Sequence, residues 1–379
     1  MGSSFAHGHP AFVIGVAHGV LSGWDSLKDR SEVRSISRQV GILSVNRRNF
    51  LKSAAAIAVT IPAAETVQAS VTNSETLPGD ALNPGGIRTA GVRMVPVVGG
   101  KYKVWTKRIG QGPVKVLLLH GGPGVSHEYL EAMESFLPEA AIEMYYYDQL
   151  GVSFSEQPKD PSLWTLERYC EEVEEVRRGL GLDNFVLYGH SWGGILAMEY
   201  ALKYQQHLRG LVISNMTAGT KAYLKRTATL KEQLLSAADR ARLNELEARQ
   251  DYDSPEYTAL MMDKLYPQMI CRTKPWPNAV DRAFQHMNEE IYNQMQGKSE
   301  FVVTGNLKNW ERWDRLHEIR VTTLTMGAKY DEMDPEDMKK MASMVQRGTY
   351  AYCATGSHMS FWDDQESYFR QLLAFLRTV

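Results

Sequence analysis

Cysteine is scarce in this sequence, and neither sign of charge dominates. The three cysteines, Cys170, Cys271 and Cys353, have no C-x-x-C spacing and cannot all pair, which argues against a disulfide scaffold and a cysteine-based zinc site. With 42 basic and 44 acidic residues, the net charge is −2, so no general attraction to nucleic acid or anionic membranes is expected. We therefore predict no nucleic-acid partner.

Long apolar runs and metal-binding motifs are also missing. No apolar run reaches the roughly 18 to 20 residues of a membrane span, so stable membrane insertion is not expected. No H-E-x-x-H or comparable cluster occurs, so neither a metal nor an organic cofactor is predicted. The composition, 44% hydrophobic and 23% charged, is typical of a soluble globular protein.

The first 69 residues predict an N-terminal extension that ends in an export signal. Residues 1–44 show no sustained period. N-R-R-N-F-L-K at 46–52 then precedes an apolar segment too short to span a membrane and a small-x-small site at 67–69. The R-R-x-F-L-K order resembles a twin-arginine signal, which carries folded proteins across the bacterial inner membrane. An ordinary amphipathic N-terminal helix is the alternative.

A signal of this kind belongs at the start of a chain, yet about 45 residues precede it. We hypothesise that translation begins near Leu43 or Val45 and that cleavage follows Ala69. An N-terminal peptide of the cellular protein that maps within residues 1–40 would contradict this. A periplasmic or secreted location follows, with the twin-arginine export machinery as a candidate partner, and a cytoplasmic location is the alternative.

Beyond a polar linker predicted at 70–90, strands and helices alternate. Strands are predicted at 92–97, 101–106, 114–119, 143–147, 185–188, 208–214, 322–326 and 349–353. Helices are predicted at 165–180, 195–202, 335–345 and 363–378. Antiparallel strands that lead into strand–helix alternation predict an α/β fold, a mostly parallel central sheet with helices on both faces.

One long segment interrupts this alternation. Residues 217–310 contain no convincing strand, and four helices are expected there, at 221–233, 238–249, 255–266 and 278–295. Because this segment lies between two strands of the sheet, it must form a helical cap outside it. The predicted organisation is therefore a core at 91–216, a cap at 217–310 and a second part of the core at 311–379.

The chain is organised around G-H-S-W-G at 189–193. An apolar strand precedes it and a helix follows it, which is the context in which G-x-S-x-G presents a nucleophilic serine. A side chain at Gly189 or Gly193 would collide with the neighbouring strand or helix. Ser191 is the predicted nucleophile, and a chance Gly/Ser turn is the alternative.

A serine hydroxyl needs a base, and the base needs an orienting carboxylate. His358 follows the last strand, whereas His317 precedes a strand and so faces the wrong end of the sheet. Asp331, Glu332 and Asp334 all follow the strand at 322–326. Asp334 stands before Pro335 and is typical of a helix N-cap, so Asp331 is the preferred acid and His358 the preferred base.

Stabilising a tetrahedral oxyanion takes two backbone N–H donors. The residue after the nucleophile, Trp192, supplies one, and the loop H-G-G-P-G at 120–124 supplies the other, for which Gly122 is predicted. His120 and His190 are interpreted as structural.

Four segments together resemble the proline iminopeptidases, serine peptidases with the α/β-hydrolase fold. They are H-G-G-P-G at 120–124, D-Q-L-G at 148–151, G-H-S-W-G-G at 189–194 and G-A-K-Y-D-E at 327–332. The similarity covers 92–379, including the cap. V-S-F-S at 152–155 departs from the pattern of many members, which puts the substrate pocket rather than the catalytic residues in question.

The resemblance implies that Glu300 and Glu332 bind the α-ammonium of the substrate, an interaction for which paired carboxylates are suited. From the sequence alone either residue could be a solvated surface charge. The implied activity is a serine aminopeptidase that releases proline or another mostly hydrophobic N-terminal residue from short peptides or amino-acid amides. An esterase or general amidase on the same fold is the first alternative, and a catalytically silent binding protein is the second.

Overall fold

The structure is a computed structural model, and it describes residues 90–379. The predicted extension and export signal at 1–69 and nearly all of the predicted linker at 70–90 lie outside the described residues. Among the residues described, no helix combines the length and the apolar character needed to cross a membrane.

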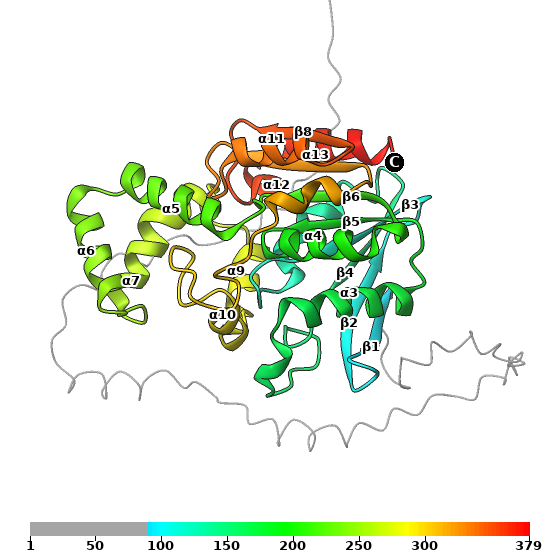
Figure 1. Ribbon diagram of the computed structural model, residues 1–379, viewed down its shortest axis with the longest axis horizontal. Helices are drawn as coiled ribbons and strands as arrows, with labels where there is room; N and C mark the ends of the chain where they lie inside the picture. Colours follow the sequence, from blue (N-terminus) through cyan, green and yellow to red (C-terminus); the bar gives the residue numbers. More distant parts are fainter. Residues whose placement is uncertain (1–89) are drawn as a thin grey trace, which may run out of the picture. The chain divides into compact units, whose positions relative to one another are not determined.

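An eight-stranded sheet forms the centre of the described chain, in the order β1-β2-β4-β3-β5-β6-β7-β8 (Figure 1). The pairings β1 with β2 and β2 with β4 are antiparallel, and all the others are parallel. The strands are β1 (Val92–Val97), β2 (Tyr102–Ile109), β3 (Val114–Leu119), β4 (Ile142–Tyr147), β5 (Phe185–His190), β6 (Leu208–Ser214), β7 (Thr323–Ala328) and β8 (Gly348–Cys353). The predicted mostly parallel sheet is confirmed.

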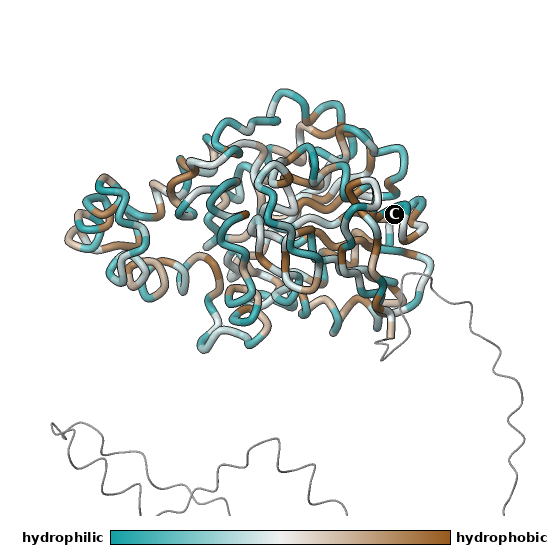
Figure 2. Tube along the Cα trace, turned by 90° about the horizontal axis from the view of Figure 1, so that it is seen from below, coloured by the Kyte–Doolittle hydropathy of each residue, from teal (hydrophilic) through white to brown (hydrophobic). Residues whose placement is uncertain are grey.

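Side chains of the inner strands alternate between two apolar cores, one on each face of the sheet. Leu117 of β3 and Leu187 of β5 belong to one core, and their neighbours Leu118 and Val186 belong to the other. Every residue of β5 is buried, as expected for a parallel strand covered on both faces. Figure 2 shows apolar residues along the inside of the fold and hydrophilic residues on its outer turns.

Helices cover both cores. The first contains side chains of α3 (Leu166–Leu180), α4 (Trp192–Tyr204) and α11 (Pro335–Met344). The second contains side chains of η1 (His127–Ser135), α12 (Ser360–Asp363) and α13 (Gln365–Leu376). Short 3₁₀ turns lie at η2 (Pro161–Leu163), η3 (Gln205–His207) and η5 (Trp313–Glu318). The predicted arrangement, helices on both faces of the sheet, is confirmed.

Between β6 and β7 the chain forms further helices outside the sheet. They are α5 (Thr220–Leu234), α6 (Ala237–Ala248), α7 (Pro255–Ala259), the π-helical turn η4 (Leu260–Leu265), α8 (Tyr266–Met269), α9 (Asn278–Gln285) and α10 (Glu289–Met295). In Figure 1, α5, α6 and α7 project to one side of the sheet, and α9 and α10 lie nearer to it. We refer to these helices as the cap.

Two cap helices differ from the prediction. The single helix expected at 278–295 is broken, because the Asn288 side chain accepts the N–H groups of Glu290 and Ile291 and starts α10 anew. Asn288 also binds the core, through its N–H to the Gly124 carbonyl (2.8 Å) and its Nδ2 to the Gly151 carbonyl (2.7 Å). The helix expected at 255–266 contains the π-helical turn η4.

Candidate active site

Ser191 stands where β5 turns directly into α4. Its backbone has φ 56° and ψ −128°, a conformation that non-glycine residues rarely adopt. A Cβ on Gly189 would lie 2.0 Å from the Gly193 carbonyl oxygen, and one on Gly193 would lie 2.2 Å from that of Leu119. Both glycines of G-x-S-x-G are therefore sterically required. The tight turn holds the serine at the end of its strand, where its side chain lines a cavity.

The structure brings His358 and Asp331 together in the loops after β8 and β7. His358 Nδ1 lies 2.8 Å from Asp331 Oδ1. The Asn215 amide donates to Asp331 Oδ2 (2.7 Å), and the Met333 N–H donates to Oδ1 (3.0 Å). Burial alone would lower the pKa of His358, but the charges of Asp331 and Glu332 outweigh it and raise that pKa to about 9. The imidazole is thus oriented and made more basic by its surroundings.

The other sequence candidates for the base and the acid lie elsewhere. Asp334 caps α11, where its side chain accepts the Glu336 N–H at 3.1 Å, and Pro335 opens the helix. His317 is exposed in η5, which precedes β7. Neither residue is among those that line the cavity at Ser191.

His190, which precedes Ser191, contacts the loop of His358 and the hydroxyl of Tyr129. Its Nε2 lies 2.9 Å from the His358 carbonyl oxygen, and its Nδ1 lies 3.0 Å from the Tyr129 hydroxyl. Burial lowers the pKa of His190 well below its usual value, so the ring is neutral and donates through one nitrogen while accepting through the other. The Tyr129 hydroxyl also accepts the Gly121 N–H (2.5 Å). His190 therefore holds the 120–124 loop and the His358 loop in place.

The loop after β3 brings Gly122 into the cavity that Ser191 lines. Gly122 has φ 111°, and a Cβ there would lie 2.6 Å from the amide nitrogens of both Gly124 and Val125, so only glycine fits. Within the described chain the Gly122 N–H has no hydrogen-bond partner. Trp192 is the first residue of α4, where a helix offers its N–H no acceptor. Both N–H groups can therefore bind an incoming oxygen.

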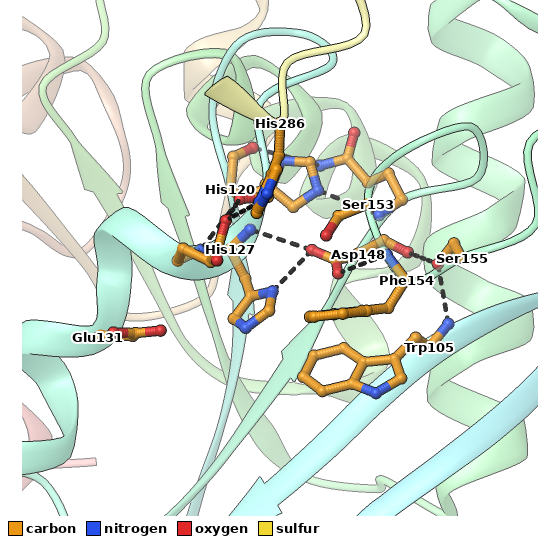
Figure 3. A network of polar contacts seen from close by, with 12 residues as sticks. Trp105, His120, His127, Glu131, Asp148, Ser153, Phe154, Ser155 and His286 are labelled. Atoms are coloured by element: carbon orange, nitrogen blue, oxygen red, sulfur yellow. Dashed lines mark hydrogen bonds and ion pairs between the residues drawn. The ribbon is translucent and has the colours of Figure 1, made fainter. Parts of the chain in front are cut away.

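Asp148 and Gln149, which follow β4, hold the loop that carries Gly122. Asp148 Oδ1 accepts from His127 through Nδ1 (2.8 Å) and through the backbone N–H (3.0 Å), as Figure 3 shows. The Gln149 N–H donates to His120 Nε2 (3.0 Å), and Gln149 Oε1 accepts from the Trp192 indole (2.8 Å). D-Q-L-G thus connects the H-G-G-P-G loop to the first residue of α4.

Glu300 and Glu332 lie at the same cavity. Hydroxyls of Tyr223 and Tyr292 donate to the two oxygens of Glu300, at 2.8 and 2.6 Å. Glu332 Oε1 lies 3.6 Å from His358 Nε2, whereas its Oε2 is buried and has no hydrogen-bond partner among the described residues. Burial raises the pKa of Glu332 well above its usual value, and the charge of Glu300 raises it further. This pair of acids would be stabilised by a cation.

The cavity has a volume of about 530 Å³ and lies between the core and the cap. Five of the predicted site residues line it: Ser191, His358, Gly122, Glu300 and Glu332. Asp331 stands behind His358, and Trp192 lines a small adjoining space. In the part of the chain that the structure describes, no group of three or more His, Cys, Asp or Glu side chains is placed to hold a metal ion. The cavity offers a serine, a histidine and paired carboxylates.

Comparison with known proteins identifies the family and the fold of the chain. A family profile described as alpha/beta hydrolase fold matches residues 115–365. A proline iminopeptidase of Flavobacterium johnsoniae is 46% identical over 283 residues, which cover 74% of this chain and 95% of that protein. The chain belongs to the proline iminopeptidase family. A proline iminopeptidase of Saccharolobus solfataricus is 34% identical over 280 residues, which cover 73% of this chain and 89% of that protein.

Two solved structures extend the similarity to three dimensions. The crystal structure of VinJ has a TM-score of 0.72 and 32% sequence identity, and covers 77% of this chain and 99% of its own. A proline iminopeptidase of Mycobacterium smegmatis has a TM-score of 0.70 and 26% identity, and covers 76% of this chain and 98% of its own. The predicted α/β-hydrolase fold is confirmed.

Sequence reasoning missed several residues that shape the site. They are Tyr129, Asn215, Tyr223 and Tyr292, which hold the 120–124 loop, Asp331 and Glu300. Asn215 carried a readable signal, because it directly follows β6 at the edge of the sheet where Asp331 was expected. Tyr223 carried none, since its partner Glu300 lies far along the chain. Tyr129 and Tyr292 are each eight residues from their partners, which lie in irregular segments where spacing predicts no contact.

Proposed function

We propose that this protein is a serine aminopeptidase that releases an N-terminal residue, proline or another mostly hydrophobic one, from short peptides or amino-acid amides. Membership of the proline iminopeptidase family supports the reaction class. The observation that carries the proposal is a pair of carboxylates, Glu300 and Glu332, in the cavity that Ser191 and His358 line. A free α-ammonium supplies the cation that this pair lacks.

The reaction begins when His358 takes the proton of Ser191 and the serine oxygen attacks the first carbonyl carbon. Asp331 holds the imidazole through Nδ1, which leaves Nε2 to accept the proton and then to deliver it to the leaving amine. The C–N bond breaks and an acyl-enzyme remains. Water, deprotonated by the same His358, hydrolyses this ester and restores the serine.

Gly122 and Trp192 are the proposed oxyanion donors. Each presents a backbone N–H without a partner among the described residues, one from the loop after β3 and the other from the start of α4. Donors that are already in place stabilise the charge as it develops on the carbonyl oxygen, and a single donor of this kind contributes about 10²- to 10³-fold in rate. The contacts of Gln149 with His120 and Trp192 hold both donors in position.

The amine site also predicts how activity depends on pH. His358 must be neutral to act as a base, so activity is lost as pH falls through its pKa, which is about 9 in the unliganded protein. A substrate ammonium between the carboxylates offsets their charge and lowers the pKa of His358 in the complex. We expect the acid limb of kcat to lie at lower pH than that of kcat/KM.

Rates measured from about pH 5 to about pH 10 with a prolyl arylamide test this prediction. In the Glu332→Gln variant one carboxylate is absent, and the acid limb of kcat/KM should move to lower pH. Coincident limbs near the usual value for histidine would show that the carboxylates do not influence the base.

An esterase or general amidase could use the same serine, histidine and aspartate. An aminopeptidase needs a substrate with a free amine, whereas an esterase or general amidase does not. An ester of a simple acid leaves Glu300 and Glu332 without a partner. Hydrolysis of proline arylamide and p-nitrophenyl acetate by the same preparation separates them. We expect kcat/KM for the arylamide to be higher by at least about 10²-fold, the scale of a buried charge-assisted contact. Faster turnover of the acetate would favour the esterase.

We propose further that the protein is exported to the periplasm or secreted through a twin-arginine signal. The R-R-x-F-L-K order at 47–52 supports this, although these residues lie outside the part that the structure describes. Cell fractionation with N-terminal sequencing tests it. A mature chain in the periplasm that begins after Ala69 is the expected result, and a cytoplasmic chain that retains 46–52 would contradict it.

A further inference from the structure

Two spaces of very different size meet at Ser191. The first is the 530 Å³ cavity beneath the cap, and the second has a volume of only about 20 Å³. Ser191, Gly122 and Glu300 line both. A peptide that reacts at Ser191 has its acyl part on one side of the scissile bond and its leaving group on the other, and the second space, with room for about one water molecule, is too small for either.

The chemistry decides where the leaving group lies. His358 delivers its proton to the leaving amine, so the leaving group lies on the side of His358. His358 lines the large space and is not among the residues that line the small one. Trp192 and Ile195 line the small space, which lies beside the proposed oxyanion donors. The large space receives the second residue of the substrate.

The cap wall of this large space, which we call the second-residue chamber, is apolar. Tyr257 and Met261 are each 4% exposed, and the rings of Tyr266 and Phe284 lie 6.4 Å apart along the same wall. On the core side, Met359 is equally buried. The unliganded chamber thus presents aromatic and thioether surface, which pairs favourably with an apolar or aromatic side chain.

The charged residues of the chamber are mostly acidic. Glu300 and Glu332 lie at its inner end, and Asp253 and Glu289 lie at exposed positions. The one lysine that lines it, Lys298, is 3.4 Å from Asp253 and is therefore offset by it. An acidic side chain at the second position would meet repulsion from these carboxylates and no unpaired lysine or arginine among the lining residues.

The cap is fastened to the core around this chamber. Arg282 of α9 forms ion pairs with Glu128 (2.9 Å) and Glu131 (2.6 Å) of η1. The N–H groups of His358 and Met359 each donate to a cap carbonyl, at 2.9 Å. The chamber is therefore held in shape before substrate arrives, and the entropy lost on binding is reduced accordingly.

We propose that the protein selects its substrates by the second residue as well as the first, and prefers a bulky apolar or aromatic side chain there over glycine or an acidic one. This inference rests on the proposed aminopeptidase function. It assigns Phe284, Met261 and Tyr266 as specificity-determining residues of the leaving-group side.

The test compares dipeptide amides that share proline and differ only at the second residue: Pro-Phe-NH₂, Pro-Leu-NH₂, Pro-Gly-NH₂ and Pro-Asp-NH₂. We expect kcat/KM for Pro-Phe-NH₂ to exceed that for Pro-Gly-NH₂ by about 10- to 100-fold, the effect of burying one large apolar side chain. Pro-Asp-NH₂ should be the poorest substrate. Prolinamide, whose leaving group is ammonia, reports on the reaction without the chamber.

The Phe284→Ala variant should reduce the Phe-to-Gly ratio by about 5- to 10-fold and leave prolinamide hydrolysis within about twofold. Phe136→Ala is the matched control, because Phe136 is also half-buried and contacts another ring, that of Phe369, but lies outside the chamber. Met261→Ala repeats the test if Phe284→Ala fails to fold. Equal kcat/KM values for Pro-Phe-NH₂ and Pro-Gly-NH₂ would overturn this inference alone. Failure to hydrolyse any of these free-amine substrates would overturn the proposed function.

Discussion

Replacing Ser191 by alanine should lower kcat for proline arylamide by about 10⁵- to 10⁶-fold, the loss found when a serine hydrolase loses its nucleophile. The oxyanion donors and the amine site would remain, so a small residual rate above that of water is expected. Alanine and serine meet the same steric demand at φ 56°, so the fold should tolerate the change. Initial rates and a thermal melt of the same preparation measure both effects.

Ser343→Ala serves as the matched control for this variant. Ser343 is exposed on α11, and its hydroxyl donates only to the Lys340 carbonyl one turn earlier. The control should retain the activity and Tm of the unchanged protein. If Ser191→Ala kept more than about one hundredth of the activity with an unchanged Tm, the serine would not be the nucleophile.

Replacing Glu300 by glutamine should lower kcat/KM for proline arylamide by about 10²- to 10³-fold, because the substrate ammonium loses a half-buried ionic partner. Glutamine preserves the shape of the side chain, and its oxygen can still accept from one of the tyrosines, Tyr223 or Tyr292. Hydrolysis of p-nitrophenyl acetate, which has no ammonium, should change by less than about threefold. The ratio of the two kcat/KM values is the quantity to measure.

Glu290→Gln is the control for charge, since Glu290 is exposed on α10 and does not line the cavity. It should leave both substrates unaffected. An equal loss on the arylamide and the acetate in Glu300→Gln would indicate a general disturbance of the site. No loss on either would remove Glu300 from the amine site.

Much of the fold could be predicted because the periodicities are strong. β5 and β6 are short apolar runs, and α3 has an apolar stripe opposite its charges, begins at the Thr165 cap and ends at Gly181 in the left-handed conformation. Elements of this kind are determined by local sequence, so they can be predicted without knowledge of tertiary contacts. The break at 286–288 had one local signal, the cap that Asn288 provides for α10. The bonds of Asn288 with Gly124 and Gly151, which join segments far apart in the sequence, could not be predicted.

The candidate site likewise contains residues with a local sequence signal and residues without one. Chain order and strand ends pointed to Ser191, Asp331 and His358, and the structure brings the last two within hydrogen-bond distance. Glu300 was reached only through the family resemblance, because it lies in an irregular segment without local signal. The tyrosines that hold Glu300 come from α5 and α10, and no sequence spacing relates them.

We propose that the cavity recognises a free α-ammonium beside the reactive serine. The most direct test is hydrolysis of proline arylamide and N-acetylproline arylamide under identical conditions, since acetylation removes the charge and leaves the scissile bond in place. We expect the free amine to be cleaved with a kcat/KM at least about 10²-fold higher, in line with a charge-assisted contact removed from water. Equal rates on the two substrates would contradict the amine site and leave a general acyl hydrolase.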